Sequence, residues 1–313
     1  LALESGKLTA SSTIEIARYN GSTGTVFVAD GAELIGTTLT RGGGSGDIGI
    51  LEGGGATVRQ TKWGGAIKLG TVSGTKGVFV LRGTAIRQAE AGDLLLGTSS
   101  SITGYGSVNS SFTASFASVL DNSGTITASG FGAEQSLVFS GYSGLDQTSG
   151  GTGSTGWYAE DGGRLVLPSI TIPAGNTVTN LAETQLSATL DLVNAVRVSL
   201  NNAVAGSLSF KLYAPERSDV PAGLDLNKTV SVWQLTAPTF DSAGLVFKLP
   251  AVEPGANLYL LRFVGTKWVV AGTVDTDSDT ASATGLLPGG VDKLGFFAVA
   301  PEVPFAGSVI VVK

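Results

Sequence analysis

Short apolar runs recur along the first half of the chain, and each is followed by a polar turn that contains glycine. Residues 22–34 (STGTVFVADGAEL) alternate apolar and polar side chains, pass through Asp30-Gly31, and close with a second apolar run. A similar order appears in residues 78–86 and, with more residues before its last valine, in residues 48–58. This alternation predicts β-strands, and its recurrence favours a repeated unit over a single hairpin.

The repeated unit consists of a short strand, a Gly-rich turn, a longer strand, an Asp-Gly or Arg-Gly turn, and a further strand. The positions that we align, Val26, Ile48 and Val78, are 22 and 30 residues apart. Three short strands in a repeat of this length predict a parallel β-solenoid, whose inward side chains stack from turn to turn. Glycine permits the corners, because it adopts positive φ without strain. A β-sandwich is the alternative for this half, whereas propeller blades need about 40 residues each.

The second half has longer alternating runs and almost no helical periodicity. Trp233 and Trp268 are expected to fill its core, and Gly265-Thr266 to form a tight hairpin turn. The spacing of these runs is typical of a sandwich. We therefore predict an all-β chain with a parallel β-solenoid (β-helix) over residues 1–178, an Ig-like antiparallel β-sandwich over residues 179–300, and an extended strand or tail over residues 301–313.

The composition excludes several classes of site. The chain has no His, Cys or Met among its 313 residues, so Ser-His-Asp and Cys-His catalysis, thiolate metal sites and disulfides are impossible. The net charge of -6 and the lack of a Lys/Arg cluster argue against nucleic acid as a partner. No apolar run is long enough for a membrane-spanning helix. Charged residues make up only 14%, so we expect part of the surface to be buried in an assembly of copies of this chain.

The Gly-rich repeats resemble those of bacterial exported proteins, of the autotransporter-associated and adhesin-passenger kind. The segments GTVFVADGAEL, GDIGILEGGGATV and LDNSGTITASG carry this resemblance. The second half is similar to a β-sandwich found near the C-terminus of bacterial surface proteins, through LYLLRFVGTKWVVAG, DTDSDT and LGFFAVAP. The resemblance implies export and a structural or adhesive role. A first residue other than Met fits removal of a signal peptide, so we expect an extracellular or cell-surface location.

Two clusters of polar residues are candidate binding sites. Asp275, Asp277 and Asp279 have the spacing of calcium ligands, although the Gly and Glu of an EF-hand loop are missing, and a solvated hairpin turn is the alternative. Calcium is the only cofactor that we consider. The segment 156–164 groups aromatic and acidic residues as sugar-binding sites do, while a loop in which Trp157 covers the last solenoid turns is the alternative. The candidate glycan residues are Trp157, Tyr158, Glu160 and Asp161.

The last residues form a β-prone run after two prolines. Val309, Ile310, Val311 and Val312 either pair within their own domain or add to an open sheet edge of a neighbouring subunit. We expect the chain to be a structural subunit of an extracellular self-assembling fibre, sheath or surface layer, joined by strand addition and end-to-end contacts. One alternative is a glycan-binding adhesin or spike module that recognises cell-surface glycan. The other is a β-helical polysaccharide lyase or hydrolase, although no catalytic cluster is evident and we do not expect an enzyme.

Overall fold

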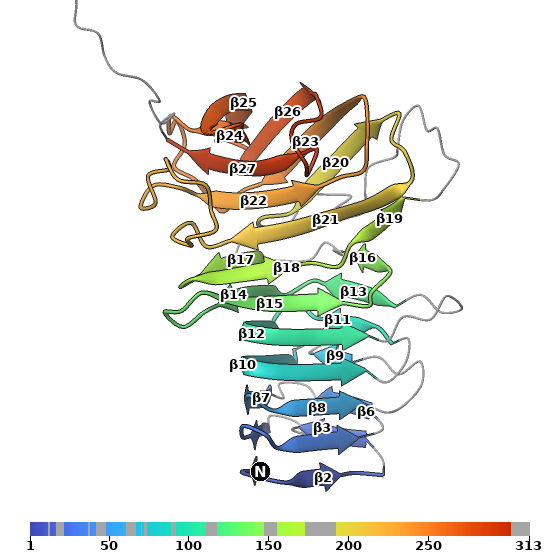
Figure 1. Cartoon of the computed structure of the whole chain (residues 1–313). Coiled ribbons are helices and arrows are strands. Elements are labelled where there is room, and N and C mark those ends of the chain that lie inside the picture. Colours follow the sequence, from blue (N-terminus) through green and yellow to red (C-terminus); the bar gives the residue numbers. More distant parts are fainter. Residues whose placement is uncertain are drawn as a thin grey trace, which may run out of the picture.

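The chain forms a column of stacked β-strands that ends in a curled antiparallel sheet (Figure 1). The computed structural model describes residues 1–11, 13–16, 22–36, 38–41, 48–60, 67–69, 71, 74–88, 92–110, 118–146, 155–172 and 192–301. These residues form strands and loops, and none of them lies in an α-helix. The all-β prediction and the parallel solenoid are therefore confirmed.

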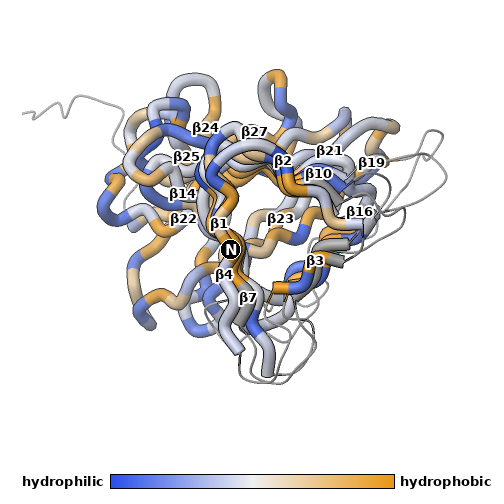
Figure 2. The backbone as a smooth tube through the Cα atoms, turned by 90° about the horizontal axis from the view of Figure 1, so that it is seen from below, coloured by the Kyte–Doolittle hydropathy of each residue, from blue (hydrophilic) through white to orange (hydrophobic). Residues whose placement is uncertain are grey.

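The solenoid has three columns of parallel strands, which the view from below shows side by side around its interior (Figure 2). β10 (Lys76–Gln88) and β12 (Ser101–Ser110) each belong to the first two columns. The remaining strands of the first column are β1 (Ala2–Leu3), β4 (Thr23–Val28), β7 (Ile48–Gly54), β14 (Thr125–Ser129) and β17 (Gly156–Glu160). Those of the second are β2 (Lys7–Thr9), β5 (Glu33–Gly36), β8 (Thr57–Gln60), β15 (Gln135–Ser140) and β18 (Gly163–Val166). The third contains β3 (Thr13–Ile16), β6 (Thr38–Arg41), β9 (Ile67–Leu69), β11 (Leu94–Leu96), β13 (Val119–Asn122) and β16 (Gly144–Asp146).

A glycine forms the corner between the first and second columns in every turn. Backbone hydrogen bonds link successive corners, as from the Gly55 N–H to the Arg82 carbonyl at 2.6 Å and from the Gly132 N–H to the Asp161 carbonyl at 3.3 Å. An L-residue with a side chain would be strained at these angles, which explains the recurring glycine. Asp30-Gly31 is therefore a solenoid corner and not a hairpin turn. The corner glycines, with φ between +66° and +130°, are Gly6, Gly31, Gly55, Gly83, Gly106, Gly132 and Gly162.

The core of the solenoid is a set of stacked apolar side chains. One stack follows the register of the first column: Val26, Leu51, Phe79, Ile102, Ile126 and Trp157 pair in sequence and are all buried. Complete burial of one such side chain contributes about 1.5–3 kcal/mol. The stacking gives each turn the same inward-facing pattern that produced the sequence repeat.

The predicted alignment of the repeats was wrong by one residue in this strand. Phe79, and not Val78, takes the place of Val26, because one residue fewer separates Leu81 from its corner glycine than separates Val28 from Gly31. Val78 is half-buried on the outward side. The alignment of Ile48 with Val26 was wrong by three residues, because Leu51 pairs with Val26 and Ile48 pairs with Thr23.

The C-terminal part continues the sheet of the solenoid in antiparallel fashion. Its strands are β19 (Ile170–Ile172), β20 (Val196–Asn201), β21 (Gly206–Tyr213), β22 (Ser231–Thr236), β23 (Ser242–Lys248), β24 (Tyr259–Val264), β25 (Lys267–Asp275), β26 (Thr280–Leu286) and β27 (Gly295–Ala300). β18 and β19 both pair with β21, which is followed by β22, β27, β24 and β25. The end of β25 pairs with β26, which leads to β23 and β20. β25 thus joins two halves of one curled sheet, and the separate sheets of an Ig-like sandwich stay a prediction.

The two tryptophans of this part lie in different apolar clusters. Trp233 packs in the main core, near Phe247, whose ring centroid is 6.4 Å away. Trp268 is buried on the other side of the sheet, in a smaller cluster with Val220 and Leu261. The expected hairpin is confirmed, with Val264 opposite Lys267 across Gly265-Thr266. The predicted domain boundary after residue 178 lies outside the described residues.

A network of charged side chains fastens the loop after β21 to the last solenoid turns. Arg217, only 7% exposed, donates from Nη1 to the carbonyls of Gln135 (3.0 Å) and Gly162 (2.6 Å). Its Nε donates to Asp219 Oδ1 at 2.8 Å. Ser218 donates to both carboxylate oxygens of Glu134, from its N–H at 2.6 Å and its hydroxyl at 2.9 Å. These bonds hold the C-terminal part on the solenoid, in addition to the shared sheet.

Candidate functional site

The structure separates the four residues of the predicted glycan site. Trp157 is fully buried and stacks on Ile126 in the solenoid core. Its backbone carbonyl accepts a hydrogen bond of 2.7 Å from the side-chain amide of Asn194, and its backbone N–H donates to the Val193 carbonyl at 3.0 Å. Trp157 therefore closes the last solenoid turns, as the alternative predicted, but it does so from strand β17 and not from a loop. A ligand at the surface does not reach it.

The other three residues of that group lie nearer the surface. Tyr158 is half-buried on the outward side of β17, and burial raises the pKa of its hydroxyl. Glu160 is exposed at the end of the strand, and partial burial together with the charge of Asp161 raises the pKa of its carboxyl group. Asp161 follows at the corner with φ of +50°. Only this outer part of the predicted group is available to a ligand.

The Asp275–Asp279 segment forms the turn between β25 and β26. Asp275 Oδ1 accepts the N–H groups of Asp277 (3.0 Å) and Ser278 (3.3 Å), and its Oδ2 accepts the Ser278 hydroxyl (2.8 Å). These hydrogen bonds lower the pKa of Asp275. Asp279 Oδ1 accepts the N–H of Val252 at 3.0 Å. Among the described residues, no group of three or more acidic side chains is arranged to hold a metal ion, so the geometry adds no support to the calcium prediction.

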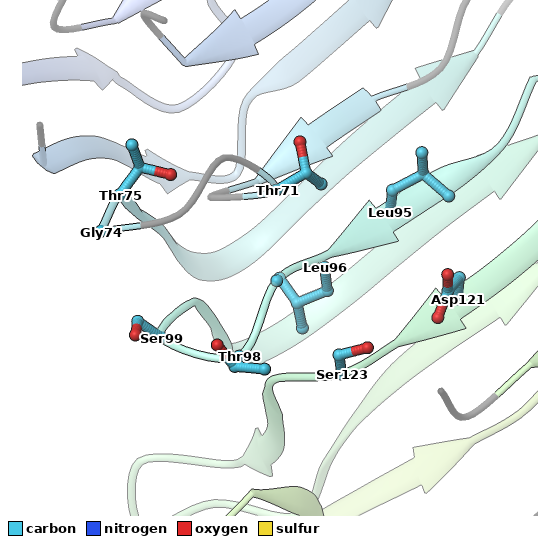
Figure 3. Close-up of a pocket in the computed structure, with 10 residues that line it drawn as sticks. Thr71, Gly74, Thr75, Leu95, Leu96, Thr98, Ser99, Asp121 and Ser123 are labelled. Carbon is cyan, nitrogen blue, oxygen red and sulfur yellow. The ribbon is translucent and has the colours of Figure 1, made fainter. Parts of the chain in front are cut away.

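A polar groove lies at another corner of the solenoid, between the third and first columns. Its volume is about 410 Å³, and side chains from successive turns line it (Figure 3). Leu95 and Asp121 lie next to each other in the register of β11 and β13. Leu96 is a second apolar side chain of the groove, and the remaining side chains carry hydroxyl groups: Thr71, Thr75, Thr98, Ser99 and Ser123. Asp121 is the one carboxylate of this lining, so it offers hydrogen bonds but no pair of acid and base groups.

The glycine corners present a row of larger side chains on the outside of the solenoid. Arg82 and Tyr105 are register partners just before their corners, and Phe131 occupies the next corner along the column. The guanidinium carbon of Arg82 lies 4.0 Å from the centroid of the Phe131 ring. The rings of Tyr105 and Phe131 meet edge to face, with centroids 6.2 Å apart. We call Arg82, Tyr105, Phe131 and Asp161 the corner strip.

Analysis of the sequence missed the corner strip for a physical reason. Its residues are 23 to 30 positions apart and come together only when the turns stack in the correct register. The available signal was the recurrence of a large or charged residue directly before a glycine, as in Arg82-Gly83 and Phe131-Gly132. The alignment error at Val78 did not affect this position, but the repeats after residue 96 were not aligned with the earlier ones.

The first solenoid turn has an open edge. β1, β2 and β3 pair with β4, β5 and β6 on one side, and no described strand lies on the other. The carbonyl groups of Leu1 and Leu3 accept hydrogen bonds from the N–H groups of Phe27 and Ala29. Because backbone groups alternate along a strand, the N–H and carbonyl groups of Ala2 point away from β4 to the open side. By the same alternation Lys7 and Thr9 of β2 have outward N–H and carbonyl groups, because Gly6 and Ala10 bond to β5.

The opposite end of the solenoid is covered in part. The backbone N–H of Trp157 in β17 bonds to the carbonyl of Val193, and β18 pairs with β21. β16, the last described strand of the third column, pairs with β13 alone among the described strands. The first turn, by contrast, has an open edge in all three columns. The predicted assembly residues Val309, Ile310, Val311 and Val312 lie outside the described residues.

Comparison with known proteins gave no assignment. No model of a protein family matches the chain, and neither the curated proteins nor the solved structures contain a match. In the part of the chain that the structure describes, no helix is long and apolar enough to cross a membrane.

Proposed function

We propose that the chain is a structural subunit of an extracellular self-assembling fibre, sheath or surface layer. The open edge of β1, β2 and β3 is the observation that carries this proposal. Unpaired N–H and carbonyl groups on an edge strand recruit a strand from another chain. The edge also exposes apolar surface, since Leu1 is 71% and Leu8 39% exposed. The low content of charged residues and the resemblance to exported surface proteins support the location.

The occupant that we propose for this edge is the same edge of a second copy. The first turn is open in all three columns, so two first turns that face each other bring three rows of free strand groups together. A contact between identical surfaces is two-fold symmetric and closes on itself. This contact alone would therefore give pairs, and a fibre would need a second contact. The predicted strand at Val309–Val312 is our candidate for that contact.

The edge can be tested without disturbing the solenoid. Thr9→Pro removes an N–H group that points away from the sheet, so every hydrogen bond within the chain is kept. Leu8→Asp places a charge on the apolar part of the edge. We expect the unmodified chain to form dimers or larger species as its concentration rises, in sedimentation velocity and multi-angle light scattering. Both variants should raise the protein concentration needed for association at least tenfold.

The control is Val204→Asp, which places the same charge on an exposed valine between β20 and β21. It should associate as the unmodified chain does. A chain that stays monomeric at high concentration contradicts the proposal, as does association that neither Thr9→Pro nor Leu8→Asp weakens. The lyase or hydrolase alternative gains no specific support from the described residues.

A further inference from the structure

We propose that the corner strip binds a neutral glycan chain that runs along the solenoid axis. The strip consists of Arg82, Tyr105, Phe131 and Asp161, which lie on successive corners of the column. With strands about 4.8 Å apart, three spacings give the strip a length of roughly 14 Å. This inference is independent of the proposed assembly, because it concerns the side of the solenoid and not its open edge.

Phe131 is the first reason for the proposal. Its φ of +50° is unfavourable for a residue with a bulky side chain, and glycine would adopt this angle without strain. The ring is nevertheless 39% exposed, so its apolar surface is incompletely buried. A strained backbone that holds an aromatic ring at the surface is typical of a functional position. The fold alone would be served as well by glycine, which occupies the position before the corner in an earlier turn, where Gly54 is the register partner of Arg82.

The neighbours of Phe131 hold the ring in a fixed orientation. The Arg82 guanidinium lies over the ring at 4.0 Å, and the edge of the Tyr105 ring approaches it at 6.2 Å between centroids. Cation–π and edge-to-face contacts of this kind favour one ring position over others. The Phe131 N–H also bonds to the Ser129 hydroxyl at 3.3 Å. The ring is therefore a rigid platform, which lowers the entropy lost when a flat ligand stacks on it.

The polar groups of the strip match the edges of a sugar ring. A pyranose presents C–H groups on its faces and hydroxyl groups at its rim, so it stacks on an aromatic ring and forms hydrogen bonds around it. Arg82 supplies N–H donors, Asp161 supplies carboxylate acceptors, and the Tyr105 hydroxyl can do both. Asp161 is exposed one corner beyond Phe131.

The charge around the strip selects against anionic ligands. Glu160, which precedes Asp161, and Glu134, in the loop that follows Phe131, are both exposed, and the whole chain carries a net charge of -6. Nucleic-acid bases also stack on aromatic rings, but their phosphates require basic surroundings. A sulfated or uronic-acid polymer would be repelled for the same reason. A glycan without charged groups is the ligand class that fits both the rings and the carboxylates.

The decisive variant is Phe131→Gly. It removes the platform and relieves the positive φ, so it should leave the midpoint of urea unfolding unchanged or raise it. Binding is measured by isothermal titration calorimetry with cellohexaose, xylohexaose, mannohexaose and chitohexaose. We expect at least one of these hexasaccharides to bind, with affinity falling tenfold or more in Phe131→Gly. Asp161→Asn, which tolerates the left-handed backbone, should weaken binding severalfold.

Phe27→Thr is the matched control, because Phe27 is also 39% exposed but lies on an outward position of β4 away from the strip. It should bind like the unmodified chain. The proposal is overturned if none of the four hexasaccharides binds at millimolar concentration, if Phe131→Gly retains full affinity, or if Phe27→Thr loses as much. Binding of a dT12 oligonucleotide in place of the sugars would also overturn it, since it would assign the strip to nucleic acid.

Discussion

The solenoid and the C-terminal part bury apolar side chains in different ways. In the solenoid, Phe79 stacks between Leu51 and Ile102, which belong to the turns before and after it. In the C-terminal part, Phe247 lies between Trp233 and Phe297, which come from strands far apart in the sequence, with ring centroids 6.4 Å and 5.9 Å away. The first arrangement depends on neighbouring turns, whereas the second needs several strands at once.

This difference predicts two kinds of unfolding within one chain. Repeat structures lose stability mainly at the damaged repeat and its neighbours, because each repeat contacts only the next. A core built from distant strands is lost as one cooperative unit. The two parts nevertheless share a sheet through β18 and β21 and one continuous apolar cluster. We call the pairing of β18 with β21, together with the hydrogen bonds of Arg217 to the solenoid, the joint. The joint therefore determines how far a local defect spreads.

The largest effect is expected from Phe247→Ala. Phe247 is 1% exposed, and removal of a buried phenyl ring costs about 3–5 kcal/mol. Because its neighbours come from different strands, we expect amide hydrogen exchange to accelerate together over β20 to β27. Mass spectrometry of the exchanged protein would show this as a shared increase across residues 196–300.

Phe79→Ala provides the matched comparison in the solenoid. Phe79 is 2% exposed, so the cost in free energy is similar. Exchange should accelerate mainly in β7, β10 and β12 and stay slow in β22 and β27. Equal acceleration throughout the chain in both variants would contradict the distinction between local and cooperative unfolding.

Arg217→Met tests the joint and should have the next largest effect. The change removes the Arg217 donor from the carbonyls of Gln135 and Gly162 and leaves Asp219 without its buried partner. Breaking a buried pair from one side costs about 3 kcal/mol. We expect the loop that follows β21 to exchange faster and the two parts to unfold at separate temperatures in calorimetry.

Lys7→Met is the control, because it removes a charge that contributes little to stability. Lys7 forms an ion pair of 3.3 Å with Glu33 at the exposed first turn. Exposed pairs of this kind contribute about 1 kcal/mol or less. A similar loss of stability in Lys7→Met and Arg217→Met would mean that the joint has no special role.

Much of the fold could be predicted because its determinants are local. Alternation identified the strands, and the short apolar runs at Ile14–Ile16 and Ile67–Leu69 gave the third column. The register between turns could not be predicted. One residue more separates Val28 from Gly31 than separates Leu81 from Gly83, and the pattern of apolar and polar residues does not reveal this difference. The joint was also out of reach, because Arg217 meets Gln135 and Gly162 only through the tertiary structure.

The candidate sites show the same limit. The presence of Trp157 beside acidic residues suggested a sugar site, yet its position in the inward stack follows from pairing with Ile126. The corner strip, by contrast, combines Arg82, Tyr105 and Phe131 from three repeats. Residue types near one another in the sequence indicate a site only if the local strand points them outward, and burial of Trp157 could not be deduced from its neighbours.

Gly31→Ala is expected to cost about 1 kcal/mol, because it forces a side chain onto a left-handed backbone. Gly31 has φ of +72°, and a Cβ atom there would meet nothing within 4 Å, so backbone strain is the whole effect. Gly265→Ala is the counterpart in the C-terminal part, with φ of +66° and equally open space. Urea unfolding should give similar costs for both. Exchange should accelerate around β4 and β5 in the first variant and over all C-terminal strands in the second.

The smallest effect is expected from acid, and it should act on the joint. The backbone and side-chain hydrogen bonds from Ser218 lower the pKa of Glu134. Burial opposes ionisation of Asp219, but the hydrogen bond and charge of Arg217 outweigh it and lower its pKa. Groups with lowered pKa in the folded state stabilise it above their unfolded pKa values, and this stabilisation is lost as the pH falls through the folded values. The loop that follows β21 should therefore exchange faster, relative to its intrinsic rate, as the pH falls from about 6 to about 3.

Glu134→Gln and Asp219→Asn identify the origin of this pH dependence. Each variant removes one titrating carboxylate from the joint, so the acid-induced loosening of the loop should become shallower. Asp275→Asn is the matched control, because the pKa of Asp275 is also lowered by hydrogen bonds, but in the turn between β25 and β26. It should leave the pH dependence of the joint unchanged. If the loop after β21 responds to acid equally in all three variants, the carboxylates of the joint are not what couples the two parts, and the shared strand pairing of β18 and β21 alone holds them together.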